Sequence, residues 1–186
     1  MCSPEMEKSL TNDLLKHKEL HISLGTHCGV ASDLKNLGLR VASFPFDWIL
    51  SFNHRGFIQC LRDKCSDFIN PLYLIRSSSG TVINTKYMFD FRHDWKIGAD
   101  TDWESIETKN IQDKYTRRIS RFFDVLSEFK GAAHFYRKPF ENRHSISGLD
   151  TFNVSAYDPI PNNVRDELIT VLCELFPNLN FQVHTV

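Results

Sequence analysis

The stretch Ile22-Ser23-Leu24-Gly25-Thr26-His27-Cys28-Gly29 decides how the chain begins to fold. Its first three residues form a short apolar run that stops at Gly25, which predicts a strand leaving the core through a tight loop. Beyond the loop, helical spacing relates four apolar residues, Val30, Ala31, Leu34 and Leu37, and Gly38 then provides a helix end. Cys28 is therefore predicted at or near the N-terminus of a helix.

The C-terminal part of the chain repeats the change from strand to helix. Ala132–Tyr136 is typical of a strand, Val164–Leu175 of a helix beginning after Pro161, and Phe181–Val186 of a final strand. This order favours a parallel crossover, so we predict an α/β layered domain with a mostly parallel central sheet flanked by helices. An α+β arrangement is the alternative. We expect a polar helical arm over residues 1–20 and one domain over 21–186.

Three further elements are predicted between these ends. A helical stripe, Phe57, Leu61, Cys65, Phe68 and Ile69, ends at Asn70-Pro71 and carries Cys60 and Cys65 on one helix. Tyr87, Phe89 and Phe91 alternate with polar residues as in a half-buried strand, and His93 shares their face by parity. Lys96–Asn110 reads as a surface loop or flap, followed by a long amphipathic helix that ends near Gly131.

Composition and charge limit the class of protein. The chain has 186 residues, 41% hydrophobic and 24% charged, and a net charge of -1, which fits one globular domain and disfavours nucleic acid as a partner. Its five cysteines are odd in number and irregularly spaced, so we expect reduced thiols and a cytoplasmic location. No apolar run has the length of a signal peptide or a membrane span, so no membrane is expected.

Cys28 is the strongest candidate for a nucleophile. Free N–H groups and the positive end of a helix dipole stabilise a thiolate there, and the loop residues Gly25, Thr26, His27 and Gly29 are candidates for holding an oxyanion. His93 is the candidate base, with Asp94 or Asp47 orienting its ring. Asp94 serves only if the chain bends after the strand, because alternation points its side chain away from His93. The simpler alternative is a small buried cysteine and a hydrogen-bonded histidine.

Three blocks in order carry a resemblance to a known family. They are Ile22-Ser23-Leu24-Gly25 with Cys28, Ala31, Leu34, Gly38-Leu39-Arg40, Ser43 and Pro45-Phe46-Asp47-Trp48-Ile49; Phe91-Arg92-His93-Asp94-Trp95; and Lys114-Tyr115 with Arg117-Arg118-Ile119 and Arg121-Phe122. Together they resemble a family of papain-like cysteine peptidases, a domain family of otherwise unknown function. The likeness covers about residues 22–137, and the α+β alternative corresponds to the papain-like arrangement.

The resemblance implies a thiol hydrolase with Cys28 as nucleophile, His93 as general base and acid, and an aspartate completing the set. Its substrate would be a peptide, an isopeptide, or another amide or thioester. Ile22 stands where papain-like enzymes place an oxyanion glutamine, six residues before the nucleophile. The oxyanion donor would then be backbone N–H near Cys28, or His27. A binding or regulatory module that keeps the fold without turnover is the other function to consider.

Anion and metal binding are the remaining alternatives. The Gly25–Gly29 loop is placed to cradle a phosphate, although it lacks the glycine patterns of nucleotide-binding loops. The arginines Arg40, Arg117, Arg118 and Arg137 are candidates for contacting an anionic group. We expect no cofactor and no metal, because Cys60 and Cys65 form one loose pair where structural zinc needs two close pairs. The oligomeric state stays open.

Overall fold

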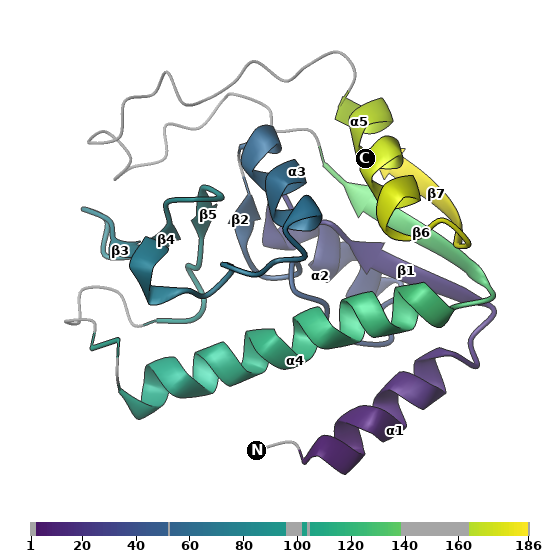
Figure 1. The fold of residues 1–186 in the computed structure, drawn as a ribbon, viewed down its shortest axis with the longest axis horizontal. Coiled ribbons are helices and arrows are strands. Elements are labelled where there is room, and N and C mark those ends of the chain that lie inside the picture. The colour runs from purple at the N-terminus through teal and green to yellow at the C-terminus, as the bar shows by residue number, and fades with distance from the viewer. Residues whose placement is uncertain (1–2, 52, 96–101, 104, 139–163, 186) are drawn as a thin grey trace.

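The structure, a computed structural model, describes residues 3–51, 53–95, 102–103, 105–138 and 164–185. Its helices are α1 (Pro4–Leu14), α2 (Cys28–Asn36), α3 (His54–Arg62), α4 (Ile106–Glu128) and α5 (Val164–Leu175), with a 3-10 turn at Pro71–Tyr73. Its strands are β1 (Glu19–Ser23), β2 (Leu50–Ser51), β3 (Leu74–Arg76), β4 (Val82–Asn84), β5 (Phe89–Asp90), β6 (Ala132–Arg137) and β7 (Asn180–Thr185). Figure 1 shows the two groups of strands with α4 running along both.

A parallel sheet has the strand order β1-β6-β7. Ile22, Phe135 and Val183 lie in one row across it and are buried. The connection from β6 to β7 includes α5, which packs on β7. The predicted parallel crossover and the α/β class are therefore confirmed.

A second sheet is antiparallel, with the order β2-β5-β4-β3. Its strands are two or three residues long, too short for an alternation pattern to predict. Phe46 contacts Phe57, Phe68 and Phe89, and Phe122 of α4 packs on Phe46. One aromatic core thus joins α4 to the antiparallel sheet.

Helix α3 ends earlier than its apolar stripe suggests. The helix stops at Arg62, and Lys64 and Cys65 turn the chain with φ values of +50° and +59°. The Cys65 N–H donates to the Cys60 carbonyl, and the two buried sulfurs lie 3.4 Å apart. Cys60 therefore lies on α3, but the prediction that Cys65 lies there too is wrong.

The predicted strand through Tyr87, Phe89 and Phe91 is also shorter than expected. Met88 has a φ of +57°, β5 contains only Phe89 and Asp90, and a turn follows. The three aromatic rings are fully buried, whereas His93 in the turn is exposed. The prediction that His93 shares their face is therefore wrong, because the strand alternation ends before it.

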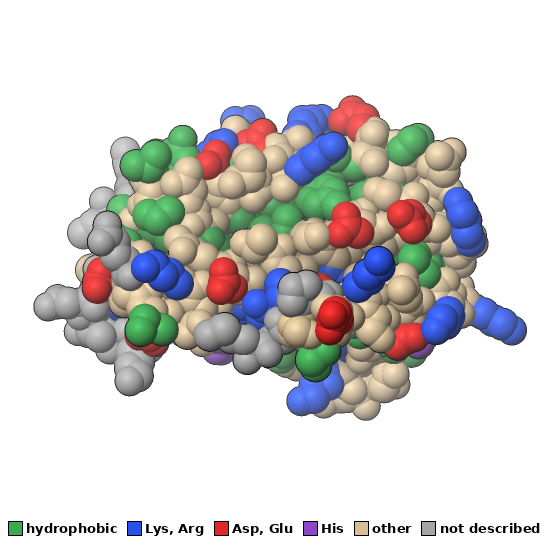
Figure 2. All heavy atoms as spheres, turned by 60° about the horizontal axis from the view of Figure 1, so that its bottom comes forward, with side chains coloured by type: hydrophobic (Ala, Val, Ile, Leu, Met, Phe, Trp, Pro, Cys, Tyr) green, Lys and Arg blue, Asp and Glu red, His purple; other side chains and the backbone are tan. Residues whose placement is uncertain are grey.

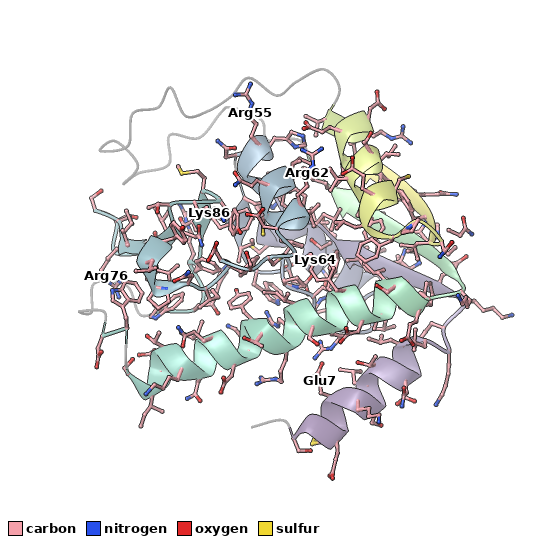
Figure 3. The ribbon with its side chains drawn as sticks, viewed as in Figure 1. Glu7, Arg55, Arg62, Lys64, Arg76 and Lys86 are labelled. Carbon is pink, nitrogen blue, oxygen red and sulfur yellow. The ribbon has the colours of Figure 1, made fainter. Side chains whose placement is uncertain are left out.

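Helix α1 packs along α4. Leu14 at its end is buried in the core. Figure 3 shows Glu7 reaching from α1 towards α4, where it pairs with Arg121. Acidic and basic side chains are interspersed over the face shown in Figure 2, without a field of one sign.

Candidate functional site

The loop between β1 and α2 has an unusual backbone. Gly25 and Thr26 have φ values of +75° and +79°, and a β-branched residue such as Thr26 is strained there by about 1–3 kcal/mol. Hydrogen bonds hold Thr26 in place: its N–H donates to Ser51 Oγ at 3.1 Å, and its carbonyl accepts from the Ser51 N–H at 3.0 Å. Its hydroxyl donates to the Lys138 carbonyl. The strain is thus maintained just before Cys28.

Gly25 brings this loop directly onto the aromatic block. A Cβ atom at Gly25 would lie 3.0 Å from Ser51 Oγ and 3.2 Å from the Phe46 carbonyl oxygen. The positive φ and this close approach both require glycine. The Cys28 loop, Phe46 and β2 therefore lie against one another.

Arg137 supports the loop from inside the protein. Its guanidinium donates to the Leu24 carbonyl at 2.6 Å, to Ser51 Oγ at 3.1 Å and to the Ser51 carbonyl at 3.1 Å, and stacks 3.9 Å from the Phe57 ring centre. Burial lowers the pKa of Arg137 to about 9. The predicted anion-binding role of Arg137 is wrong, because the side chain is buried and its donors serve the chain itself.

Cys28 is the first residue of α2 and is half-buried. His27 caps the helix, and its Nδ1 accepts the Gly29 N–H at 3.0 Å. Nδ1 then carries no proton, so the neutral ring carries it on Nε2. Burial, followed by the charge of Lys138, lowers the pKa of His27, and Asp33 opposes the shift. One predicted oxyanion donor, the Gly29 N–H, is thus used by the cap.

Gly29 leaves room for this cap. A Cβ atom there would lie 2.6 Å from Cε1 and 2.7 Å from Nδ1 of His27. These distances are far below a normal contact, although a side chain rather than backbone would have to move. Gly29 therefore positions the imidazole beside Cys28.

His93 lies in the turn that follows β5 of the antiparallel sheet. β5 pairs with β2 through Leu50 and Asp90, and the His93 ring packs edge-on against Trp48 at 6.3 Å between centroids. Trp48 follows Phe46 and precedes β2, the two segments against which the Cys28 loop rests. The Cys28 and His93 blocks thus both border the segment from Phe46 to Ser51.

Asp47, a predicted orienting residue, is bound to Arg40. Its Oδ2 accepts from Arg40 Nε at 2.9 Å and Nη2 at 2.7 Å, and from the Phe44 N–H at 3.0 Å. Burial raises the pKa of Asp47, whereas Arg40 and the Phe44 N–H lower it. The pair fixes the Phe44–Trp48 turn, so Arg40 is placed mainly as a structural partner.

Asp94, the other predicted orienting residue, faces α4. Its buried carboxylate contacts the Lys114 ammonium and accepts from the Tyr115 hydroxyl at 2.7 Å. The chain does bend after β5, as this role required, but the bend directs Asp94 towards α4. Burial raises the pKa of Tyr115, so its phenol keeps the proton that it donates to Asp94.

Asp90 is a carboxylate near His93 that the sequence did not single out. It is buried in β5, its Oδ2 accepts from Arg92 Nε at 2.9 Å, and its buried Oδ1 has no hydrogen-bond partner among the described residues. Burial raises the pKa of Asp90, and hydrogen bonding from Arg92, the charge of Arg92, hydrogen bonding from Thr81 and the charge of His93 oppose that rise. Strand alternation placed Asp90 on the open face, opposite Phe89 and Phe91, so the sequence did not mark it as buried.

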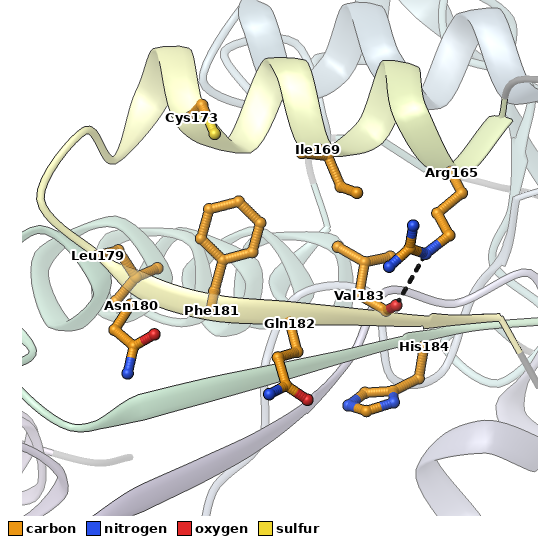
Figure 4. Close-up of a pocket in the computed structure, with 9 residues that line it drawn as sticks. All are labelled: Arg165, Ile169, Cys173, Leu179, Asn180, Phe181, Gln182, Val183 and His184. Carbon is orange, nitrogen blue, oxygen red and sulfur yellow. Dashed lines mark hydrogen bonds between the residues drawn. The ribbon is translucent and has the colours of Figure 1, made fainter.

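Two hollows lie away from these residues. One, of about 490 Å³, lies between α5 and β7, where Figure 4 shows Phe181 and Val183 towards the helix and Gln182 and His184 on the other side. The other, of about 440 Å³, lies between α4 and residues 65–71. Neither is lined by Cys28 or His93.

Among the described residues, no group of three or more His, Cys, Asp or Glu side chains is arranged to hold a metal ion. None of the described helices is long and apolar enough to cross a membrane. Cys28, Cys60, Cys65 and Cys173 are free thiols, and Cys2 lies outside the described residues.

Comparisons with known proteins agree with the three sequence blocks. The sequence profile of a family described as "Putative papain-like cysteine peptidase (DUF1796)" matches residues 19–150. The "Uncharacterized protein R408" of Acanthamoeba polyphaga mimivirus is 30% identical over 164 residues, covering 76% of this chain and 73% of that protein. No solved structure matches the chain significantly.

Proposed function

Because the chain belongs to this family of papain-like cysteine peptidases, we propose that it is a cytoplasmic thiol hydrolase acting on a peptide or another acyl substrate. The observation that carries the proposal is the position of Cys28, at the first residue of α2 and directly after a strained loop held by Ser51. Strain of this kind concentrates at functional sites. The free thiols of the described cysteines support the cytoplasmic location.

The reaction proceeds through an acyl-enzyme. The Cys28 sulfur attacks the substrate carbonyl carbon while His93 takes the thiol proton, and the tetrahedral intermediate expels the amine or thiol, which receives that proton from His93. Water then attacks the thioester, losing a proton to His93. The carboxylic acid and the free Cys28 thiol are released.

The oxyanion requires a donor, since Ile22 replaces a glutamine. His27 Nε2–H suits this role, because the cap on Gly29 N–H fixes both the tautomer and the ring. The backbone N–H of Cys28 is a second donor. Losing one such donor costs about 100- to 1000-fold in rate, so the replacement matters.

We assign the third position to Asp90 rather than to Asp47 or Asp94. Both of those carboxylates are bound by other side chains. Asp90 also pairs with Arg92 through Oδ2, but its charge interacts with that of His93. A carboxylate in that position favours the imidazolium that forms during the reaction.

Labelling with iodoacetamide tests the proposal. Mass spectrometry of each cysteine peptide across pH compares Cys28 with the exposed Cys173 as an internal control. We expect Cys28 to react faster at pH 7, His93→Ala to slow it to the rate of Cys173, and Asp90→Asn to have an intermediate effect. Equal rates for the two cysteines that His93→Ala leaves unchanged would contradict the proposal.

One observation favours a second function, a binding module without turnover. Asp47 and Asp94, the two carboxylates of the family blocks, both serve structural pairs. Such a module would leave Cys28 unreactive, and the Cys28→Ser protein would bind its partner as the wild type does. The labelling experiment separates the two functions.

A further inference from the structure

Helix α4 gathers charged side chains from three other parts of the chain. Arg121 pairs with Glu7 of α1 at 2.5 Å, and Lys114 contacts the Asp94 carboxylate in the His93 turn. Beside them, Arg40 pairs with Asp47 at 2.7 Å. Each of these three carboxylates is thus already neutralised by a cation of the same cluster.

Arg118 is the cation of this cluster that lacks such a partner. It is half-buried, with its guanidinium 5.7 Å from the centre of the Tyr115 ring. Its Nη1 is buried and has no hydrogen-bond acceptor, and no ion pair of Arg118 occurs among the described residues. A buried donor without an acceptor costs about 1–3 kcal/mol in desolvation. A ligand that accepts a hydrogen bond from Arg118 would recover part of this cost.

The surroundings of Arg118 concentrate positive charge. Burial lowers the pKa of Arg118, with Arg40 and Arg121 adding to this and Tyr115 and Asp47 opposing it. Burial, followed by the charges of Arg118 and Arg117, also lowers the pKa of Lys114. An added negative charge would relieve this repulsion.

The cluster adjoins the His93 turn. Lys114, one helical turn before Arg118, contacts Asp94, the residue next to His93. Arg40 lies 5.4 Å from the centre of the Trp48 ring, on which His93 packs. A group bound by Arg118 would therefore lie beside the proposed general base.

We propose that Arg118 binds a carboxylate of the substrate, so that the hydrolase prefers acyl substrates bearing an acidic group. The substrate preference rests on the proposed function, whereas binding of the carboxylate does not. A guanidinium fork matches a carboxylate. The three pairs leave the positive charges of Arg118 and of the half-buried Arg117 unpaired, and of these two Arg118 has the buried donor without an acceptor.

Direct binding is tested by nuclear magnetic resonance of the arginine Nε–Hε groups. Acetate is titrated into the full chain at constant ionic strength, with inorganic phosphate in a parallel titration. We expect a saturable shift of the Arg118 signal that persists in Arg117→Gln, a matched loss of charge on the same helix, and is absent in Arg118→Gln. Arg118→Lys, which keeps the charge but not the fork, should bind about 10-fold more weakly.

Two results would overturn the assignment. One is the absence of a saturable acetate shift, or an equal acetate response of the protein in Arg118→Gln. The other is tighter binding of phosphate than of acetate, which would replace a carboxylate with a phosphoryl group as the ligand.

The link to the substrate is tested with bromoacetamido-alkanoic acids of increasing length, each paired with its neutral primary amide. The Cys28 sulfur displaces bromide from both, so the rate ratio of acid to amide cancels the reactivity of the thiol. We expect a ratio of about 10 or more at one length, from one charge-assisted contact, and a ratio near 1 in Arg118→Gln.

These outcomes separate the two proposals. An unreactive Cys28 contradicts the hydrolase but leaves the acetate titration to decide the Arg118 site. A reactive Cys28 with an acid-to-amide rate ratio near 1 for every chain length of the bromoacetamido compounds would overturn the substrate preference.

Discussion

Arg137 and Arg118 are two partly or wholly buried arginines that the protein treats in opposite ways. Arg137 lies under the Cys28 loop, where its donors meet the Leu24 carbonyl and both oxygens of Ser51. Arg118 lies on α4, where Nη1 meets no acceptor. Each stacks on an aromatic ring, so stacking alone does not distinguish them.

The difference shows what a buried arginine reveals about its role. When the donors end on the chain's own carbonyls, as in Arg137, the residue holds the backbone in place. When a buried donor has no acceptor among the described residues, as in Arg118, we propose that a ligand supplies one. Substitution of Arg137 is therefore expected to lower the stability of the protein, whereas substitution of Arg118 is expected to weaken ligand binding.

Arg137→Met is expected to have the largest effect of any single change. It leaves the Leu24 and Ser51 carbonyls without their donor, at a cost of about 3 kcal/mol or more in the free energy of unfolding. Urea unfolding measures the loss. Arg117→Met is the control, expected to stay within about 0.5 kcal/mol. Equal losses of unfolding free energy in Arg137→Met and Arg117→Met would contradict a supporting role of Arg137 under the Cys28 loop.

Gly25→Ala and Gly29→Ala test the loop above Arg137. In Gly25→Ala, the new Cβ atom meets Ser51 Oγ and the Phe46 carbonyl, and the residue keeps a φ of +75°. This substitution should lower the free energy of unfolding by about 1–3 kcal/mol. The second meets only the His27 ring, and should change stability by less than about 1 kcal/mol while slowing the labelling of Cys28. Thermal unfolding and labelling report the two effects. A larger loss of stability in Gly29→Ala than in Gly25→Ala would contradict this prediction.

The pH dependence of stability tests the His27 cap. Burial lowers the pKa of His27, so the unfolded chain takes up this proton at a higher pH than the folded chain. The contribution of His27 to the free energy of unfolding should therefore be complete above about pH 6.5 and fall as pH is lowered towards the folded pKa. His27→Asn, which still caps a helix but does not titrate, should flatten this part of the profile. Urea unfolding at pH 5 and pH 7.5 measures the free energy of unfolding of both proteins. An equal change between these two pH values in the wild type and in His27→Asn would contradict a neutral His27 in the cap.

Arg118→Gln should have the smallest effect on stability. It removes a buried donor without an acceptor, while it also loses the interactions of Arg118 with Tyr115 and Asp47, so the free energy of unfolding should not fall and should rise by at most about 1 kcal/mol. Arg121→Gln, which loses Glu7 and the Ser43 carbonyl, is the contrasting variant and should cost about 1.5 kcal/mol or more. Similar losses for both would show that Arg118 already has a structural role.

The sequence predicts the elements whose burial follows a regular period. The strand, loop and helix around Cys28 and the crossover from β6 to β7 each follow such a period, and the structure contains them. The chain also turns at non-glycine residues with positive φ: Thr26, Lys64, Cys65 and Met88. Such residues carry no turn signal, so the end of α3 and the short β5 were not predicted.

The candidate site is harder to predict, because long-range pairs decide which groups are engaged. Asp94 contacts α4 and Asp47 binds Arg40, which short-range alternation does not indicate. Asp90 was expected on an open strand face. It is buried because β5 lies between β2 and β4 in the sheet, with the aromatic core around it. Only the three-dimensional arrangement singles it out.

The family match and the folded unit do not share their boundaries. The match covers residues 19–150, yet α1 supplies the Glu7 partner of Arg121, and β7 supplies the third strand of the parallel sheet. A chain trimmed to the matched range would turn β6 into an open edge, a template for intermolecular pairing. Its Arg121 would also lose a counter-ion next to Arg118. Experiments on such a fragment would then report self-association and misplaced charge, which would be mistaken for properties of the full chain.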